Sequence, residues 1–89
     1  VFAVKDINPK APVHMLIVPN MHIASLAYVG PGQESIMGHM FVVAEEIARR
    51  EGVTLSGYRL VVNQSDDSGQ EIPHPHMHLL GGKKLGAMG

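Results

Sequence analysis

The segment of this chain best suited to do chemistry is HPHMHLLGG, residues 74–82, which holds three of the six histidines. His74, His76 and His78 fall at every second position. In a β-strand they would share one face, with successive Cα atoms of the row about 6.6 Å apart. Pro75 has no N–H to give to a strand ladder, which predicts an edge-like strand or a bulge beside the row.

Three uses of such a row compete. Imidazole is a common zinc ligand, although three in a row would strain to reach one tetrahedral centre and no carboxylate has HExxH spacing. Imidazoles can also attack an electrophile, move a proton and orient one another. The third use is a polar face with no chemistry, satisfied by backbone bonds. The tight spacing favours chemistry but leaves all three open.

The composition limits the class of protein to which this chain can belong. The 89 residues suffice for one small domain, and 45% hydrophobic residues are typical of a globular protein. Without cysteine there is no disulfide framework and no thiolate nucleophile, and we expect a cytoplasmic location. A net charge of -1 without a basic run argues against nucleic acid as a partner. No apolar run reaches the roughly 18 residues of a membrane span, so no membrane partner is expected.

Alternation and turn residues predict an α+β protein with an antiparallel sheet and one long helix packed on a face. A stripe of apolar residues at helical spacing marks the helix over 33–52, with Glu45–Arg49 and Glu46–Arg50 pairs on its wet side and Gly52 as its stop. The expected stripe is Ile36, Met40, Val43, Ala44 and Ile47. We expect strands at 1–7, 13–19, 57–64 and 71–82, a short helical turn at 24–28, turns at 8–12 and 65–69, and a loose tail at 83–89.

Several motifs resemble one family. HPHMHLLGG resembles the signature of the histidine triad (HIT) family, and its LGG ending is similar to the Hint branch of nucleoside phosphoramidate hydrolases, in particular its prokaryote-like members. DINPKAPVHMLIVPNMHI (6–23) resembles the D-I-x-P-x-A-P-x-H segment of that branch. GYRLVVNQ followed by SGQE, and GHM at 38–40, fit as well. The resemblance covers nearly the whole chain.

The resemblance implies a HIT-like α+β fold with about five antiparallel strands, assembled as a two-fold dimer with a continuous sheet. The HIT domain would span 1–82, followed by the tail 83–89. The helix and strand that the family normally carries before VFAVKDI are not present, and since the chain starts at Val1 we expect it to be part of a longer one.

The resemblance also implies a mechanism without metal or cofactor. His76 would attack the α-phosphorus of a purine nucleoside 5′-phosphoramidate, with its other nitrogen held by a backbone carbonyl of the adjacent strand segment. Amine would leave, and water would release the nucleoside monophosphate from the nucleotidyl-histidine. His78 would contact the phosphate and assist the leaving group, His74 would shape and polarise the pocket, and His14 would complete the network.

A further set of residues would bind the substrate by the same resemblance, beside His76 and His78. Asp6 would accept bonds from the ribose hydroxyls, or merely begin a turn before Asn8. Ile7 would pack on the base or sugar. The other expected contacts are an amide donor at Asn63, backbone N–H groups at Gly69 and Gln70, and Glu71, which stands where another branch has serine. The loop 65–70 reads equally well as a plain hairpin turn.

The remaining histidines are interpreted as structural: His22 as a polar loop residue and His39 as a helix residue with a packing or capping role. Two further functions stay open beside the phosphoramidase. One is a diadenosine polyphosphate hydrolase of the same superfamily. The other is a non-catalytic nucleotide-binding or scaffold protein, which would bind AMP without turnover.

Overall fold

A single antiparallel sheet carries the histidines. The computed structural model describes residues 1–21 and 25–89. Within them the sheet has four strands in the order β1-β2-β4-β3, fewer than the five that the family resemblance implies. Their bounds are Phe2–Lys5 for β1, Val13–Val18 for β2, Tyr58–Val62 for β3 and Met77–Gly81 for β4. The last strand in sequence thus lies between two others, with β2 on one side and β3 on the other.

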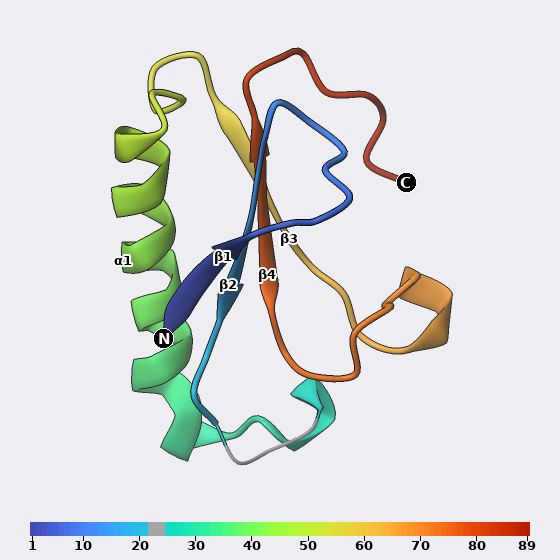
Figure 1. Cartoon of the computed structure of the whole chain (residues 1–89). Helices are drawn as coiled ribbons and strands as arrows, with labels where there is room; N and C mark the ends of the chain where they lie inside the picture. The colour runs from blue at the N-terminus through green and yellow to red at the C-terminus, as the bar shows by residue number, and fades with distance from the viewer. Residues whose placement is uncertain (22–24) are drawn as a thin grey trace.

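One long helix, α1 (Glu34–Arg50), runs along one face of the sheet, as Figure 1 shows. The loop after β1 and the loop between β3 and β4 lie on the other side of the sheet (Figure 1). Three short 3-10 turns complete the described elements: Leu26–Tyr28, Pro31–Gln33 and Asp66–Ser68. No helix in the described parts of the chain is long and apolar enough to cross a membrane. The α+β prediction is confirmed.

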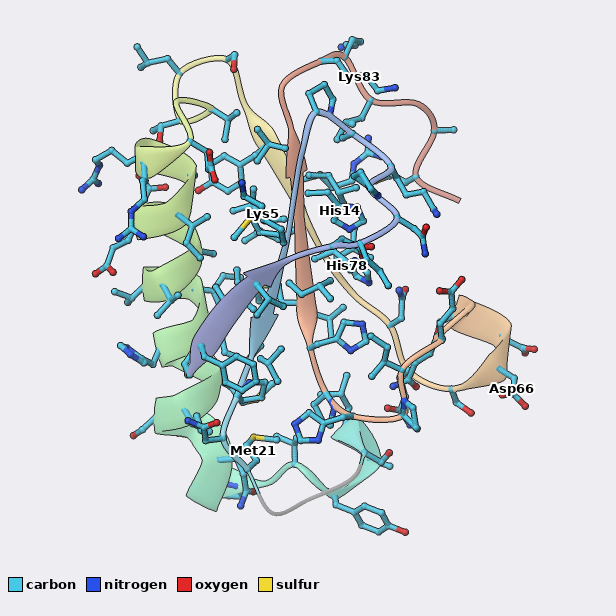
Figure 2. All side chains as sticks on the ribbon, viewed as in Figure 1. Lys5, His14, Met21, Asp66, His78 and Lys83 are labelled. Carbon is cyan, nitrogen blue, oxygen red and sulfur yellow. The ribbon has the colours of Figure 1, made fainter. Side chains whose placement is uncertain are left out.

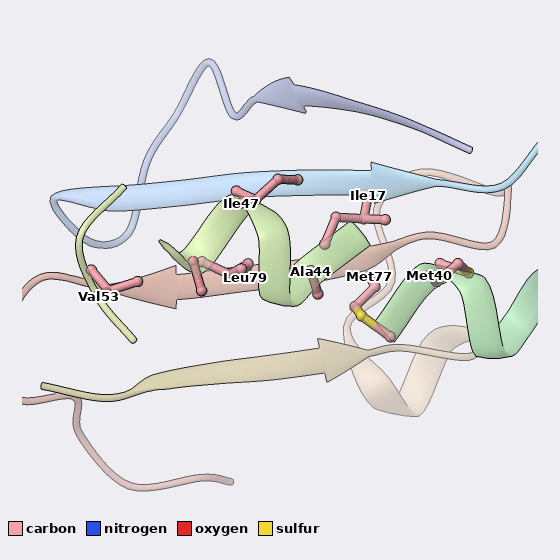
Figure 3. Packing of buried hydrophobic residues seen from close by; sticks show 8 residues of the cluster. Ile17, Met40, Ala44, Ile47, Val53, Met77 and Leu79 are labelled. Atoms are coloured by element: carbon pink, nitrogen blue, oxygen red, sulfur yellow. The ribbon is translucent and has the colours of Figure 1, made fainter. Parts of the chain in front are cut away.

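The core lies between α1 and the sheet (Figure 3). Of the predicted helical stripe, Met40, Ala44 and Ile47 are buried, while Ile36 and Val43 are half-buried. From the sheet come Ile17 of β2 with Met77 and Leu79 of β4, and Ala48 and Val53 complete the cluster. Because strand side chains alternate between faces, burial of positions 77 and 79 against α1 turns the intervening residue 78 to the opposite face.

The helix ends as the sequence predicts. Gly52 has a φ of 73°, and its N–H donates to the carbonyl of Arg49 at 3.2 Å. The N–H of Val53 donates to the carbonyl of Ala48 at 2.9 Å, which completes a Schellman C-cap. The Glu45–Arg49 ion pair forms at 3.2 Å. The Glu46–Arg50 pair is absent from the ion pairs of the described residues.

The prediction of a strand over 71–82 is wrong at its start. β4 begins at Met77, so His74 and His76 precede the strand and do not form one row with His78. Pro73 and Pro75 supply no N–H for a ladder, and the N–H of His74 turns back to the carbonyl of Ile72 at 2.8 Å. This turn gives each of the three histidines a different environment.

Candidate active site

Two histidines from neighbouring strands meet on the face of the sheet away from α1. His14 of β2 pairs directly opposite Leu80 of β4, which places it diagonal to His78. The Nε2 atom of His14 lies 2.9 Å from the Nδ1 atom of His78, within hydrogen-bond distance. Figure 2 shows the two labelled side chains together, although 64 positions separate them in sequence. His14 is buried and His78 is half-buried, so the pair is open on the side of His78.

His76 is fixed by its own segment. Its Nδ1 atom lies 2.7 Å from the carbonyl oxygen of His74. A carbonyl only accepts, so Nδ1 carries the proton and the lone pair of the neutral ring is on Nε2. A backbone carbonyl holds this ring, as predicted, but it belongs to the residue two positions earlier in the same segment and not to an adjacent strand. The ring centroids of His76 and His78 are 4.9 Å apart in an edge-to-face arrangement.

His74 is placed differently from its two neighbours. Its Nε2 atom lies 3.2 Å from the carbonyl oxygen of Pro19, at the end of β2. His74 thus contributes to the site through its backbone carbonyl, which accepts a hydrogen bond from Nδ1 of His76. The ring itself ties the turn before β4 to the loop after β2.

A cavity of about 770 Å³ opens beside His14, His76 and His78, within the range of small-molecule sites. It is lined by most of the residues expected to bind substrate: Asp6, Ile7, Asn63, Gly69 and Glu71. Neither His74 nor Gln70 is among its lining residues. A second cavity of about 680 Å³ lies near the end of α1 and has no histidine in its lining. The cavity of about 770 Å³ is therefore the candidate active site, because three histidines line it.

The loop between β3 and β4 is held by its own hydrogen bonds. The N–H of Gly69 donates to Asp66 at 3.0 Å and the N–H of Gln70 to Ser65 at 3.4 Å, both to backbone carbonyls. The side chain of Gln70 also accepts from the N–H of Ser65 at 2.6 Å and donates to the carbonyl of Ile72 at 2.8 Å. Both backbone N–H groups expected to meet substrate are engaged within the loop in this conformation, and their role as donors stays a prediction.

The two carboxylate oxygens of Asp6 have different partners, and its role toward the ribose stays a prediction. One carboxylate oxygen, Oδ1, accepts the N–H of Asn8 at 2.8 Å, which is the turn-initiating role. The other oxygen, Oδ2, lies 3.5 Å from Nε2 of His14, at the edge of the cavity. A single aspartate thus shapes the loop after β1 and faces the histidines.

The surroundings of His78 favour its neutral form. Burial lowers the pKa of His78, and the neighbouring His76 and His14 lower it further. The carboxylates of Asp6 and Glu71 act in the opposite direction but do not outweigh these effects. At neutral pH the ring therefore has one proton to give and one lone pair, which suits proton transfer.

The profile of the HIT domain matches residues 1–85. The chain belongs to the HIT family. A purine nucleoside phosphoramidase of Escherichia coli is 48% identical over 88 residues, which cover 99% of this chain and 74% of that protein. An uncharacterized HIT-like protein of Buchnera aphidicola is 49% identical over 83 residues, 93% of this chain and 73% of that protein.

Solved structures of the HIT family have the same fold. A HIT family hydrolase from Legionella pneumophila superposes with a TM-score of 0.90 at 40% identity, covering 94% of this chain and 75% of that one. A histidine triad protein from Clostridium difficile also has a TM-score of 0.90 at 40% identity, covering 98% and 76%. The HIT fold inferred from the motifs is confirmed.

Two contacts of this HIT site were not expected from the sequence. The backbone N–H of Lys10 donates to Nδ1 of His14 at 3.0 Å, and the carbonyl of Pro19 contacts His74. Nearly every residue has the same backbone groups, proline lacking only the N–H, so no sequence signal could have identified these two. Of the two histidines interpreted as structural, His39 is exposed on α1, and His22 lies outside the described residues.

Proposed function

We propose that this HIT protein hydrolyses the P–N bond of purine nucleoside 5′-phosphoramidates through a nucleotidyl-histidine at His76. The observation that carries the proposal is the bond from Nδ1 of His76 to the carbonyl of His74. It leaves the Nε2 lone pair of a buried imidazole for attack, beside a cavity of nucleotide size. The phosphoramidase relative from Escherichia coli supports the choice of substrate.

The reaction has two displacements at one phosphorus. Nε2 of His76 bonds to the α-phosphorus as the P–N bond breaks, and the amine departs with the Nε2 proton of His78. The negative charge left on His78 is balanced by the imidazolium charge formed on His76, whose Nδ1 keeps its proton. Water then attacks the same phosphorus, breaks the bond to Nε2 and gives up a proton to His78. The products are amine and nucleoside monophosphate, and His76 is restored. Covalent catalysis of this kind divides one difficult step into two easier ones.

The substrate would lie across the cavity with its phosphate at the histidines. Asp6 and Ile7 lie on the loop after β1, where the ribose hydroxyls would meet a carboxylate and the base an apolar side chain. Asn63, Gly69 and Glu71 line the cavity from the segment between β3 and β4, where they would meet the phosphate and the leaving group. Gln70 would act on the substrate indirectly, by holding this loop.

The active unit in this proposal is a two-fold dimer. β3 is an edge strand, and its last residue Val62 is exposed. Phe41 and Val42 are exposed apolar residues of α1. A second copy pairing along β3 would continue the sheet and cover apolar surface, as two-fold interfaces commonly do. Sedimentation should give twice the 9.6 kDa mass of one chain, and a monomer would contradict the proposal.

The cytoplasmic location stays a prediction.

Amine release from adenosine 5′-phosphoramidate tests the function. Metal-stripped protein should turn over, His76→Ala should not, and His39→Ala should retain the activity because that ring is exposed on α1. Mass spectrometry during turnover should detect protein carrying one nucleotidyl group. AMP binding without turnover would indicate a binding protein instead, and turnover that survives in His76→Ala would refute the mechanism.

A further inference from the structure

The two ring nitrogens of His14 face different kinds of partner. Nδ1 lies 3.0 Å from the backbone N–H of Lys10, which can only donate. Nδ1 must therefore present its lone pair. A neutral imidazole carries one proton, so that proton is on Nε2 of His14.

The same reasoning continues to the next ring. The protonated Nε2 of His14 lies 2.9 Å from Nδ1 of His78 and donates to it. Nδ1 of His78 is then the acceptor, and its single proton is on its own Nε2. A backbone group outside the triad thus determines where the proton of His78 lies, two hydrogen bonds away.

We propose that the main-chain N–H of Lys10 is a positioning group that fixes the tautomers of His14 and His78, so that His78 presents an N–H at Nε2. The role of the Nε2 N–H of His78 as donor to the departing amine rests on the proposed function. The tautomers themselves do not. With the opposite tautomers His78 would present a lone pair, and it would compete with His76 instead of assisting it.

Asp6 favours the same tautomer but is less suited to fix it. Its Oδ2 is 3.5 Å from Nε2 of His14, longer than the usual 2.7–3.2 Å of an N–H···O bond. Its other oxygen is already engaged by Asn8. In the proposed complex the carboxylate of Asp6 would turn to the ribose, whereas the Lys10 contact involves no substrate.

The loop from Asp6 to His14 is built to hold this N–H in place. A hydrogen bond of 3.0 Å from the backbone N–H of Asp6 to the carbonyl of His14 closes the loop. Pro9 and Pro12 flank the segment around Lys10 and fix their own φ angles. The ammonium group of Lys10 donates to the carbonyl of Asn8 at 3.4 Å, whereas the backbone N–H of Lys10 donates to His14, so the contact with His14 uses the N–H and not the ammonium group.

The tautomer also bears on metal binding. One oxygen of Asp6 and ring nitrogens of His14 and His78 all lie within 4.8 Å of one another, a grouping that could hold a metal ion. A metal needs an unprotonated nitrogen. Nε2 of His14 carries a proton as long as Lys10 donates to Nδ1, so the same N–H disfavours a metal at this cluster.

The first test is a long-range ¹H–¹⁵N correlation spectrum of the histidine rings in the wild-type protein without substrate, at about pH 8, above the usual histidine pKa of about 6.5. Protonated and unprotonated ring nitrogens resonate in separate regions. We expect Nδ1 unprotonated and Nε2 protonated in both His14 and His78. A proton on Nδ1 of either ring would overturn the proposal. This result is independent of turnover, so it stands or fails apart from the proposed function.

The second test replaces one N–H by oxygen. The Lys10→Ala variant keeps the amide, and the matched protein carries lactic acid at position 10, which makes that bond an ester. The amide variant should keep the wild-type tautomers. In the ester, Nδ1 of His14 would face an oxygen, which can only accept. The proton of His14 should therefore move from Nε2 to Nδ1, and the proton of His78 should then move from its Nε2 to its Nδ1. Unchanged tautomers in the ester would show that Asp6, and not Lys10, is the controlling group.

Discussion

Replacing His74 by alanine should have a small effect, although His74 is the first histidine of the motif. Its ring does not line the cavity, and the group that it offers to His76 is its backbone carbonyl, which alanine retains. The substitution removes one side-chain bond, of 3.2 Å, to the carbonyl of Pro19. Such a bond contributes about 0.5–1.5 kcal/mol to stability.

The free energy of this one hydrogen bond also limits the effect of the substitution on the rate. If the whole loss were expressed in the transition state, about 1.4 kcal/mol would lower kcat/KM by a factor of ten. We therefore expect His74→Ala to lose at most about tenfold in kcat/KM for adenosine 5′-phosphoramidate. The His76→Ala variant should lose its activity altogether, since no nucleophile remains. Steady-state kinetics of the two variants side by side would measure the difference.

A matched variant distinguishes the structural hydrogen bond of the His74 ring from a direct part of that ring in the reaction. His74→Gln places an amide N–H near the position of Nε2, the atom that contacts the carbonyl of Pro19, so it should recover part of the lost stability in urea denaturation. A fall in kcat/KM of more than about 100-fold in both His74→Ala and His74→Gln, corresponding to about 2.7 kcal/mol, would exceed what a single structural bond supplies. That result would mean that the imidazole itself takes part in the reaction, and the reasoning from the cavity would be wrong.

Three other predictions concern stability. Gly82→Ala should cost about 1–2 kcal/mol in urea denaturation, because Gly82 has a φ of 89° and an added Cβ would lie 3.0 Å from Cβ of Pro12; an unchanged midpoint would contradict this. Tyr58→Phe should cost about 1.5 kcal/mol without lowering kcat, because it removes a 2.6 Å bond to Glu45 far from the cavity; a loss of activity would contradict the assignment of the site. Burial and the neighbouring histidines lower the pKa of His78, so the folded protein takes up its proton at lower pH than the unfolded chain does. Its contribution to the free energy of unfolding should be complete above about pH 6.5 and decline as the pH falls below that value; a His78→Asn variant should show a weaker decline, and a steeper one would refute the assignment.

The sequence by itself was sufficient for the local elements. The helix over 33–52 followed from one apolar stripe and a glycine stop, and α1 spans Glu34–Arg50 with Gly52 directly after the C-cap residue Glu51. The strands also followed from alternating or apolar segments bounded by turn residues, apart from the start of the last one. Such patterns are readable because the periods of helix and strand repeat within a few residues. The family motifs likewise identified the HIT domain, which matches residues 1–85.

The tertiary structure alone decided how the histidines divide their roles. Whether His14 meets His78 depends on β4 lying beside β2, a pairing across 64 positions that no local pattern contains. The row of three was broken by prolines, whose missing N–H groups ended the ladder at Met77. The groups that hold the rings, the N–H of Lys10 and the carbonyl of His74, are backbone atoms. Every residue has a carbonyl and every residue except proline has an N–H, so only the folded path of the chain determines which of them meets a histidine.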